Sequence, residues 1–190
     1  MQERTVNDYL NKLSELTLQA LVTDSAGMTI SLEEGAEKAV RMLIDLRAGS
    51  RKVMLGGNGG SAAIVSHVQN DLSEAAGVRA MVFTEQPLLT ALANDEGYVS
   101  VFEWPIVLWA EPGDLLITVS SSGRSENIVR ALAAAREKDC GIITLSGFDT
   151  DNSSRQMGNV NFYVPSHVYA YVETAHTALA HYLTSMAAVC

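Results

Sequence analysis

Beyond residue 52, short apolar segments alternate with stretches whose apolar residues recur at helical spacing. Apolar runs of strand length without polar alternation are typical of strands that are buried on both faces. The pattern therefore predicts an α/β fold, a three-layer sandwich in which helices cover both faces of a five-stranded parallel sheet. The expected strands cover residues 52–56, 79–83, 114–120, 141–146 and 160–164, and the expected helices cover residues 61–75, 87–93, 98–110, 125–138 and 168–187. Pro105 is expected to kink the 98–110 helix or to begin a new one.

Two helices are expected before this alternation. Apolar residues at helical spacing run from Val6 to Leu21, and residues 23–29 break the pattern. The segment Ser31-Leu32-Glu33-Glu34 has the spacing of a capping box and starts a second helix that ends near Leu46. The first helix lies outside the alternation, so its apolar face is predicted to pack between subunits of a homo-oligomer. The alternative is that it covers one face or edge of the sheet.

Composition narrows the class of protein. A length of 190 residues fits one domain spanning residues 1–190, and 47% hydrophobic with 18% charged residues is typical of a soluble globular protein. The formal charge of −9 argues against a nucleic-acid backbone as partner. No run approaches the roughly 18 apolar residues of a membrane-spanning helix, and no apolar signal segment opens the chain. Cys140 and Cys190 form no disulfide framework, so a reducing cytoplasm is the expected location.

A glycine-rich loop, Gly56-Gly57-Asn58-Gly59-Gly60-Ser61, lies between an expected strand and an expected helix. Such a turn leaves backbone N–H groups free, and the start of the helix adds positive potential. The loop therefore predicts an anion site, most often one for phosphate. The alternative is that the glycines serve only the sterics of a tight turn. Since no Lys follows Gly60, the loop does not have the pattern of a nucleotide-binding P-loop.

A serine-rich loop, Ser120-Ser121-Ser122-Gly123-Arg124-Ser125, joins another apolar strand to another helix. Its hydroxyls and the free N–H groups of the helix start are suited to an anion. The alternative is a serine-rich turn in which Ser125 is simply the N-cap. Ligands of open α/β sheets bind at the carboxyl ends of the strands, where both loops lie. The pair of loops therefore favours a ligand site.

Histidine and acidic residues recur on two of the expected helices. His67 and Asp71 share one helix face at i, i+4, and Glu173 and His181 are eight residues apart on the last helix. The four could hold Zn²⁺, or one carboxylate and one His could move a proton without metal. The spacing leaves both readings open. Of the other histidines, His176 lies on the far side of Glu173 from His181, and His167 is expected to have a local or interface role.

Three segments together resemble a known family. They are Gly57–Ala63 followed by His67, Ala93-Asn94-Asp95-Glu96-Gly97-Tyr98, and Ser120 to Asn127. Their order and spacing are similar to those of the sugar isomerase (SIS) domain proteins, most closely to the phosphoheptose isomerases among them, from the first helix to the last. The resemblance implies a flavodoxin-like sheet and a homotetramer. It also implies an aldose/ketose phosphosugar isomerase that acts on sedoheptulose 7-phosphate through an enediol.

The resemblance also assigns roles to residues. It implies Asp71 and His181 as catalytic residues, and His67, Asp71, Glu173 and His181 as ligands of Zn²⁺. The implied substrate-binding residues are Asn58, Gly59, Gly60, Ser61, Asn94, Asp95, Ser120, Ser121, Ser122, Ser125 and Glu173.

The chain departs from the family pattern at three places. Asp71 stands where the family has Glu, Glu173 where it has Gln, and Ala170 where it has Asp. Asp71 is one methylene shorter than Glu, and Glu173 adds a negative charge that would tighten a divalent metal site. A different phosphosugar is therefore an alternative substrate. A non-catalytic SIS protein that binds a phosphosugar or a partner protein is the alternative function, and a sugar-phosphate-sensing domain is a third.

Overall fold

The computed structural model describes residues 5–49 and 51–190. In this part of the chain, one seven-stranded sheet has the order β2-β1-β7-β6-β5-β3-β4. The five expected strands are present and run parallel to one another, which confirms the flavodoxin-like core. They are β3 (Lys52–Gly57), β4 (Arg79–Val82), β5 (Leu115–Ser120), β6 (Gly141–Ser146) and β7 (Val160–Tyr163).

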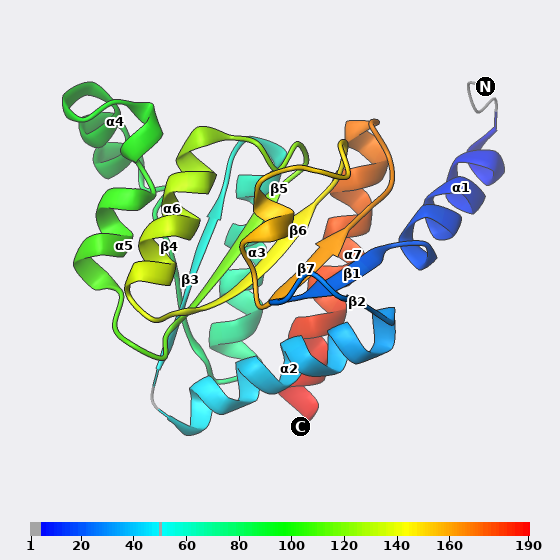
Figure 1. Ribbon diagram of the computed structural model, residues 1–190, viewed down its shortest axis with the longest axis horizontal. Coiled ribbons are helices and arrows are strands. Elements are labelled where there is room, and N and C mark those ends of the chain that lie inside the picture. The colour runs from blue at the N-terminus through cyan, green and yellow to red at the C-terminus, as the bar shows by residue number, and fades with distance from the viewer. Residues whose placement is uncertain (1–4, 50) are drawn as a thin grey trace.

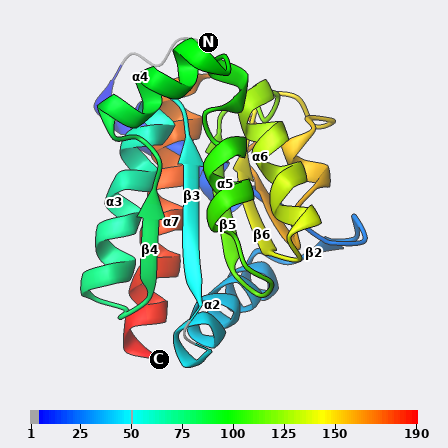
Figure 2. The ribbon, with the colours of Figure 1, turned by 90° about the vertical axis from the view of Figure 1, so that its left-hand side faces the viewer.

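Helices cover both faces of the sheet, as a three-layer sandwich requires (Figures 1 and 2). One apolar core lies between the sheet and α2 (Leu32–Ala48), α3 (Gly60–Glu74) and α7 (Tyr169–Val189). A second core lies on the opposite face, beneath α4 (Gln86–Asp95), α5 (Glu103–Trp109) and α6 (Glu126–Glu137). The start of α2 has the expected capping box, in which Ser31 and Glu34 bond to each other's backbone N–H groups.

The expectation of five strands was wrong, because the sheet in the described residues has seven. The two additional strands form a short hairpin. Leu21, expected as the end of the first helix, and the segment expected to break the pattern contribute to β1 (Leu21–Asp24) and β2 (Thr29–Ile30), and β1 pairs antiparallel with the edge strand β7. The Asp24 carboxylate accepts hydrogen bonds from two N–H groups of the turn, and Gly27 there has a φ of 76°. Strands this short carry almost no periodicity, and the pairing with β7 is what stabilises them. The Asp-x-x-Gly turn was the readable signal.

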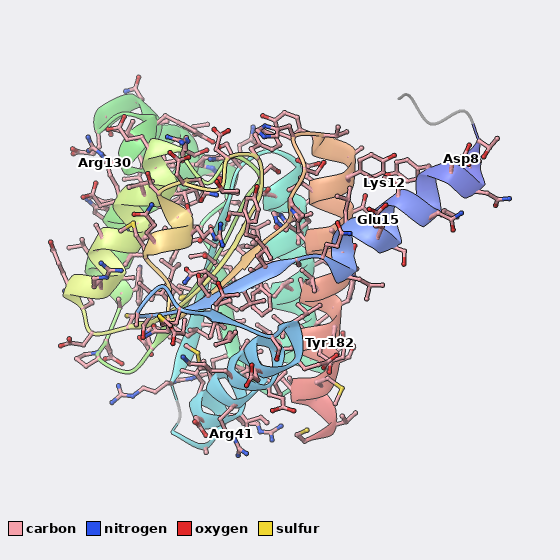
Figure 3. All side chains as sticks on the ribbon, turned by 45° about the vertical axis from the view of Figure 1, so that its right-hand side comes forward. Asp8, Lys12, Glu15, Arg41, Arg130 and Tyr182 are labelled. Carbon is pink, nitrogen blue, oxygen red and sulfur yellow. The ribbon has the colours of Figure 1, made fainter. Side chains whose placement is uncertain are left out.

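The first helix, α1 (Val6–Leu18), projects away from the sheet (Figures 1 and 3). It ends before Leu21 because that residue already pairs with Tyr163 in the sheet. Its contact with the body includes Tyr9, whose ring stacks on Tyr171 with centroids 4.9 Å apart. The side chain of Leu10 is 52% exposed and that of Leu18 is 72% exposed. A single chain therefore leaves an apolar face of α1 uncovered.

The segment expected as one helix over residues 98–110 is two elements. A 3₁₀ turn, η1 (Tyr98–Ser100), precedes α5, and a second, η2 (Ser154–Gln156), lies in the loop before β7. Pro105 lies in the first turn of α5, where its missing N–H costs nothing, so it belongs to the start of a new helix rather than to a kink. No helix in the described residues has the length and apolarity needed to span a bilayer. A single domain over residues 1–190 stays a prediction.

Candidate active site

The glycine loop connects β3 to α3 by a close backbone approach. A side chain at Gly57 would meet the backbone oxygen of Ser61 at 2.7 Å, so only glycine fits this turn. Gly59, the N-cap of α3, has a φ of 54° and a ψ of −124°, a combination that glycine adopts most readily. The loop therefore brings the N-terminus of α3 to the carboxyl end of the sheet, with its first N–H groups free of helical partners.

The serine loop joins β5 to α6 in the same way, beside the glycine loop. Ser125 occupies the N-cap position of α6, but its hydroxyl makes no capping hydrogen bond. The hydroxyl of Ser121 is buried and has no hydrogen-bond partner among the described residues. A buried hydroxyl without a partner costs free energy unless a ligand or water satisfies it. The Ser121 hydroxyl is therefore available to a ligand, whereas those of Ser120 and Ser122 already accept hydrogen bonds from backbone N–H groups of the loop.

The shape of the serine loop depends on the segment that follows β6. Gly123 has a φ of 60°, and a Cβ there would overlap the side chain of Asn152, which is fully buried. The backbone N–H of Ser154 donates to the carbonyl oxygen of Gly123 at 2.9 Å. The Arg124 guanidinium pairs with Asp149 and Asp151 rather than with the serine hydroxyls.

The two loops and the start of α7 enclose a cavity of about 290 Å³. Its lining consists of Asn58, Gly59, Gly60, Ser61, Ser120, Ser121, Ser122, Ser125, Tyr169 and Glu173. Glu173 is the one charged side chain in this lining, and its carboxylate lies against Gly60, where a Cβ would come within 2.5 Å of it. The cavity can hold an anion through hydroxyls, N–H groups and two helix N-termini, without a lysine or arginine among these lining residues.

A second group of side chains lies between α3 and α7. Nε2 of His67 is 3.5 Å from one carboxylate oxygen of Asp71, and Nδ1 of His181 is 3.2 Å from the other. The buried Thr184 hydroxyl lies 3.4 Å from the Asp71 oxygen that His181 contacts and 3.2 Å from the carbonyl oxygen of His181, so its one proton can be donated to either acceptor. A cavity of about 270 Å³ between the two helices is lined in part by His67 and His181.

The donor atoms of His67, Asp71 and His181 suit a divalent metal. One ligand atom from each residue lies within 4.8 Å of the other two. Ligands at about 2.0–2.2 Å from a tetrahedral Zn²⁺ are about 3.3–3.6 Å apart. The nitrogens of His67 and His181 lie 3.5 and 3.2 Å from the two different oxygens of Asp71, close to that range. The nitrogen and carboxylate donor set is one that zinc accepts. His67, Asp71 and His181 are therefore suitable ligands for Zn²⁺.

Some of the expected site residues lie apart from these two groups. Glu173 lines the anion cavity and is not one of the three clustered metal-ligand candidates, so its role as a ligand stays a prediction. Asn94 and Asp95 are at the end of α4, where the amide of Asn94 donates to Asp95 at 2.8 Å, and neither lines the anion cavity. Their contact with a sugar stays a prediction as well.

The other two histidines have the separate positions that the sequence suggested. His176 is fully buried, and its Nε2 lies 3.0 Å from the carbonyl oxygen of Ser146. Burial lowers the pKa of His176 to about 4. His167 is exposed and lies against Phe148 and Asp149.

Sequence reasoning missed three residues of this region. Tyr169 lines the anion cavity, and its spacing of one helical turn from Glu173 was the available signal. Thr184 bonds to Asp71 from a helix position that gives no hint of it. Asn127 forms two hydrogen bonds with Asn58, although its motif had suggested only the serine loop.

Comparisons with known proteins agree with this geometry. The profile of the SIS domain family matches residues 8–147. A phosphoheptose isomerase from Shewanella denitrificans is 34% identical over 161 residues, which are 80% of this chain and 82% of the relative. The solved phosphoheptose isomerase of Neisseria gonorrhoeae has a TM-score of 0.83 at 25% identity and 97% coverage of both chains.

A second solved structure shows the same fold at lower identity. The phosphoheptose isomerase of Francisella tularensis has a TM-score of 0.82 at 22% identity, covering 96% of this chain and 95% of that one. Both the family profile and the curated relative extend over most of the chain. The chain therefore belongs to the SIS domain family, and phosphoheptose isomerases are among its relatives.

Proposed function

We propose that this protein is an aldose/ketose phosphosugar isomerase that converts sedoheptulose 7-phosphate to a heptose 7-phosphate. One observation carries the proposal: α3 and α7 each contribute residues both to the anion cavity and to the cluster of His67, Asp71 and His181. Ser61 and His67 are six residues apart on α3, and Glu173 and His181 are eight apart on α7. These separations correspond to roughly 9 and 12 Å along a helix, which the open chain of a phosphosugar can span.

The anion cavity would hold the phosphate end. Hydroxyls of Ser61, Ser120, Ser121, Ser122 and Ser125, with N–H groups around Gly59 and Gly60, supply the donors. The N-termini of α3 and α6 add favourable potential for a dianion. Asn58, and in the family pattern Asn94 and Asp95, would contact the sugar hydroxyls. The opposite end of the sugar would then reach the cluster between α3 and α7.

The cluster would move the proton. Asp71 takes the proton from the carbon next to the carbonyl, while His181 donates a proton to the carbonyl oxygen, and an enediol results. His181 then removes the proton of the neighbouring hydroxyl, and Asp71 returns its proton to the other carbon. Charge and atoms balance, since one hydrogen has moved between the adjacent carbons and one between their oxygens, and both side chains have regained their starting protonation. The hydrogen bond from Thr184 helps to orient the Asp71 carboxylate for this transfer.

Zn²⁺ is the proposed cofactor. His67, Asp71 and His181 would hold it, and Glu173 stays the predicted fourth ligand. When bound, the ion supplies Lewis-acid polarisation of the sugar oxygens. Whether Asp71 is a metal ligand is tested by the metal content of Asp71→Asn. If Asp71 is a ligand, this variant loses bound metal, and full retention of metal would rule that role out.

The deciding experiment is turnover of sedoheptulose 7-phosphate by the purified protein, with zinc content measured on the same sample. Turnover with stoichiometric zinc would support the proposal. Binding of the sugar phosphate without turnover, in zinc-loaded protein, would favour the non-catalytic binding protein instead. Turnover of a shorter phosphosugar but not of the heptose would mean that the protein is a phosphosugar isomerase with a different substrate.

We also propose a homotetramer, because the chain has two separate apolar surfaces, and a cytoplasmic location, because Cys140 and Cys190 are both free thiols. One surface lies on α1, where the side chains of Val6, Leu10 and Leu18 are exposed. The other lies on α5, at the opposite end of the molecule (Figure 1), and consists of four side chains that are about half exposed: Trp104, Val107, Leu108 and Trp109. The α5 residues expose roughly 400 Å². With a polar rim of ordinary proportion this becomes about 700 Å² per partner, near the size of a stable interface. Two self-complementary surfaces are what a tetramer built as a dimer of dimers needs.

The assembly is tested by solution mass. Leu10→Glu and Leu108→Glu should each reduce a wild-type tetramer to dimers, as measured by light scattering after size exclusion. Met28→Glu, in the exposed hairpin turn, is the control and should leave the mass unchanged. A monomeric wild type, or a tetramer that survives either substitution, would contradict the assignment of these surfaces.

A further inference from the structure

The side-chain amide of Asn58, the first residue after β3, has almost all of its hydrogen-bonding capacity in use. Its Oδ1 accepts from Nδ2 of Asn127 at 2.9 Å and from the hydroxyl of Tyr98 at 2.9 Å. Its Nδ2 donates to Oδ1 of Asn127 at 3.0 Å. A side-chain amide offers two lone pairs and two N–H bonds. One N–H of Asn58 is therefore all that the group has left for a ligand.

The two partners of Asn58 are held by separate elements. Asn127 is 3% exposed and lies in the first turn of α6, directly after the serine loop. Tyr98 begins η1, after Gly97, whose φ of 84° turns the chain there. Residues Val101 and Phe102, which follow η1, are buried in the core beneath α5 and anchor this segment. The amide is thus held from two directions, by a buried side chain on α6 and by a tyrosine whose backbone segment is anchored in the core.

The amide pair also connects the two anion-binding loops. The strands that lead into these loops are neighbours in the sheet, with Gly57 of β3 opposite Val119 of β5. Asn58 belongs to the first loop and lines the anion cavity, while Asn127 lies just beyond the second. Reciprocal hydrogen bonds between the two side chains therefore link the ends of the two loops and orient Asn58.

We propose that Asn127 and Tyr98 are positioning residues that fix Asn58 as a hydrogen-bond donor, with no acceptor capacity, toward the ligand in the cavity. The inference rests on the proposed function for the identity of that ligand, a phosphosugar. The group that Asn58 meets must be an oxygen with a free lone pair, either a sugar hydroxyl or the carbonyl oxygen. Tyr98 itself then serves the site through Asn58 rather than by direct contact with the sugar.

A double-mutant cycle tests this inference. The variants are Asn58→Ala, Asn127→Ala and the double variant, and the readouts are kcat/KM for sedoheptulose 7-phosphate and Kd for inorganic phosphate. Each single variant should lower kcat/KM about tenfold, the loss of one well-placed hydrogen bond. The double variant should be no worse than Asn58→Ala alone, because Asn127 acts through Asn58. Phosphate should bind within about twofold of wild type throughout.

Two results would overturn the inference. One is additive losses in the double variant, which would mean that Asn127 acts independently of Asn58. The other is an equal weakening of phosphate binding in Asn127→Ala, which would mark a general disruption of the serine loop. If wild-type protein shows no turnover, the proposed function fails, and the same cycle is read from the Kd of sedoheptulose 7-phosphate. The two failures are therefore distinguishable.

A second variant tests the inference even if Asn127→Ala does not fold. Tyr98→Phe removes only a hydroxyl from a half-exposed ring, so the fold should be retained. It should lower kcat/KM several-fold in the wild-type background and have no effect in Asn58→Ala. Tyr182→Phe, on the outer side of α7 (Figure 3), is the matched control and should leave kcat/KM unchanged. A loss from Tyr98→Phe that persists in Asn58→Ala would contradict the inference.

Discussion

Two sides of the same helix, α7, hold histidines in opposite environments. His181 faces α3, is 48% exposed on its side chain, and pairs with Asp71. His176 faces the sheet, is fully buried, and bonds to the backbone of Ser146. The side of α7 toward α3 therefore keeps its polar groups accessible, while the side toward the sheet excludes water. A histidine on the first can exchange protons or bind metal, and one on the second is held neutral and serves the fold.

The largest expected effect comes from the exposed side. His181→Asn should lower kcat/KM by about 10³ and remove most of the bound zinc, since a metal-ligand candidate and proton carrier are lost together. The free energy of unfolding of the metal-free protein should change by less than about 1 kcal/mol, because the side chain is half exposed. His167→Asn, an exposed histidine outside the cluster, is the control. If His181→Asn retains zinc and turnover, His181 does not have the functional role that distinguishes it from His176.

The next effect concerns acid stability and comes from the buried side. The pKa of His176 is about 4 in the folded protein because of burial, against an ordinary 6.5. Between these values the unfolded chain binds a proton that the folded one does not, so stability falls as pH falls from 6.5 to 4. The full loss is about 3 kcal/mol.

His176→Gln removes this titration and should flatten the dependence of stability on pH by that amount. Urea unfolding at several pH values between 7 and 4 measures it, and His167→Gln should keep the wild-type slope. An unchanged slope in His176→Gln would show that the buried side is not what destabilises the protein in acid.

A pair of glycines tests how tightly the two sides are packed. A Cβ at Gly147 would meet the branched side chain of Val172 at 2.7 Å on the sheet side of α7, whereas a Cβ at Gly60 would meet the carboxylate end of Glu173. Gly147→Ala should therefore destabilise by about 2 kcal/mol, since Val172 is buried and stiff. Gly60→Ala should change stability by less than about 1 kcal/mol, because a carboxylate can rotate away. Thermal unfolding of both variants measures the two stability losses. Equal losses would contradict the expected difference in packing between the two sides of α7.

The smallest effect is electrostatic. Glu173 places a negative charge in the cavity where an anion would bind. Glu173→Gln should therefore tighten the binding of inorganic phosphate to metal-free protein by roughly tenfold, the value of removing one like charge at about 5 Å in a polar cavity. Glu37→Gln, on α2, is the control. Weaker phosphate binding in Glu173→Gln would mean that the carboxylate organises the cavity instead of opposing the anion.

The same substitution examines the predicted fourth ligand. If Glu173 also holds the metal, Glu173→Gln should lower zinc affinity while phosphate binding tightens. Unchanged zinc affinity would limit the metal site to His67, Asp71 and His181.

Most of the fold could be predicted because its signals are local. The five apolar strands and the capping box of α2 depend on residues that are neighbours in sequence, and each is present in the structure. The hairpin at residues 21–30 could not be predicted with the same ease. It is stabilised by pairing with β7, which lies far away in the chain.

The candidate site divides along the same line. The amino-acid sequence by itself determined the glycine-rich and serine-rich loops at strand ends and the i, i+4 pair of His67 and Asp71, because glycine conformation, helix N-termini and helical period act over a few residues. Only the tertiary structure decided that His181 joins this pair while Glu173 lines the anion cavity, and that Asn127 and Tyr98 fix Asn58. Those contacts depend on how α7 packs against α3 and on which strands are neighbours in the sheet, and long-range packing of this kind leaves no periodic trace in the sequence.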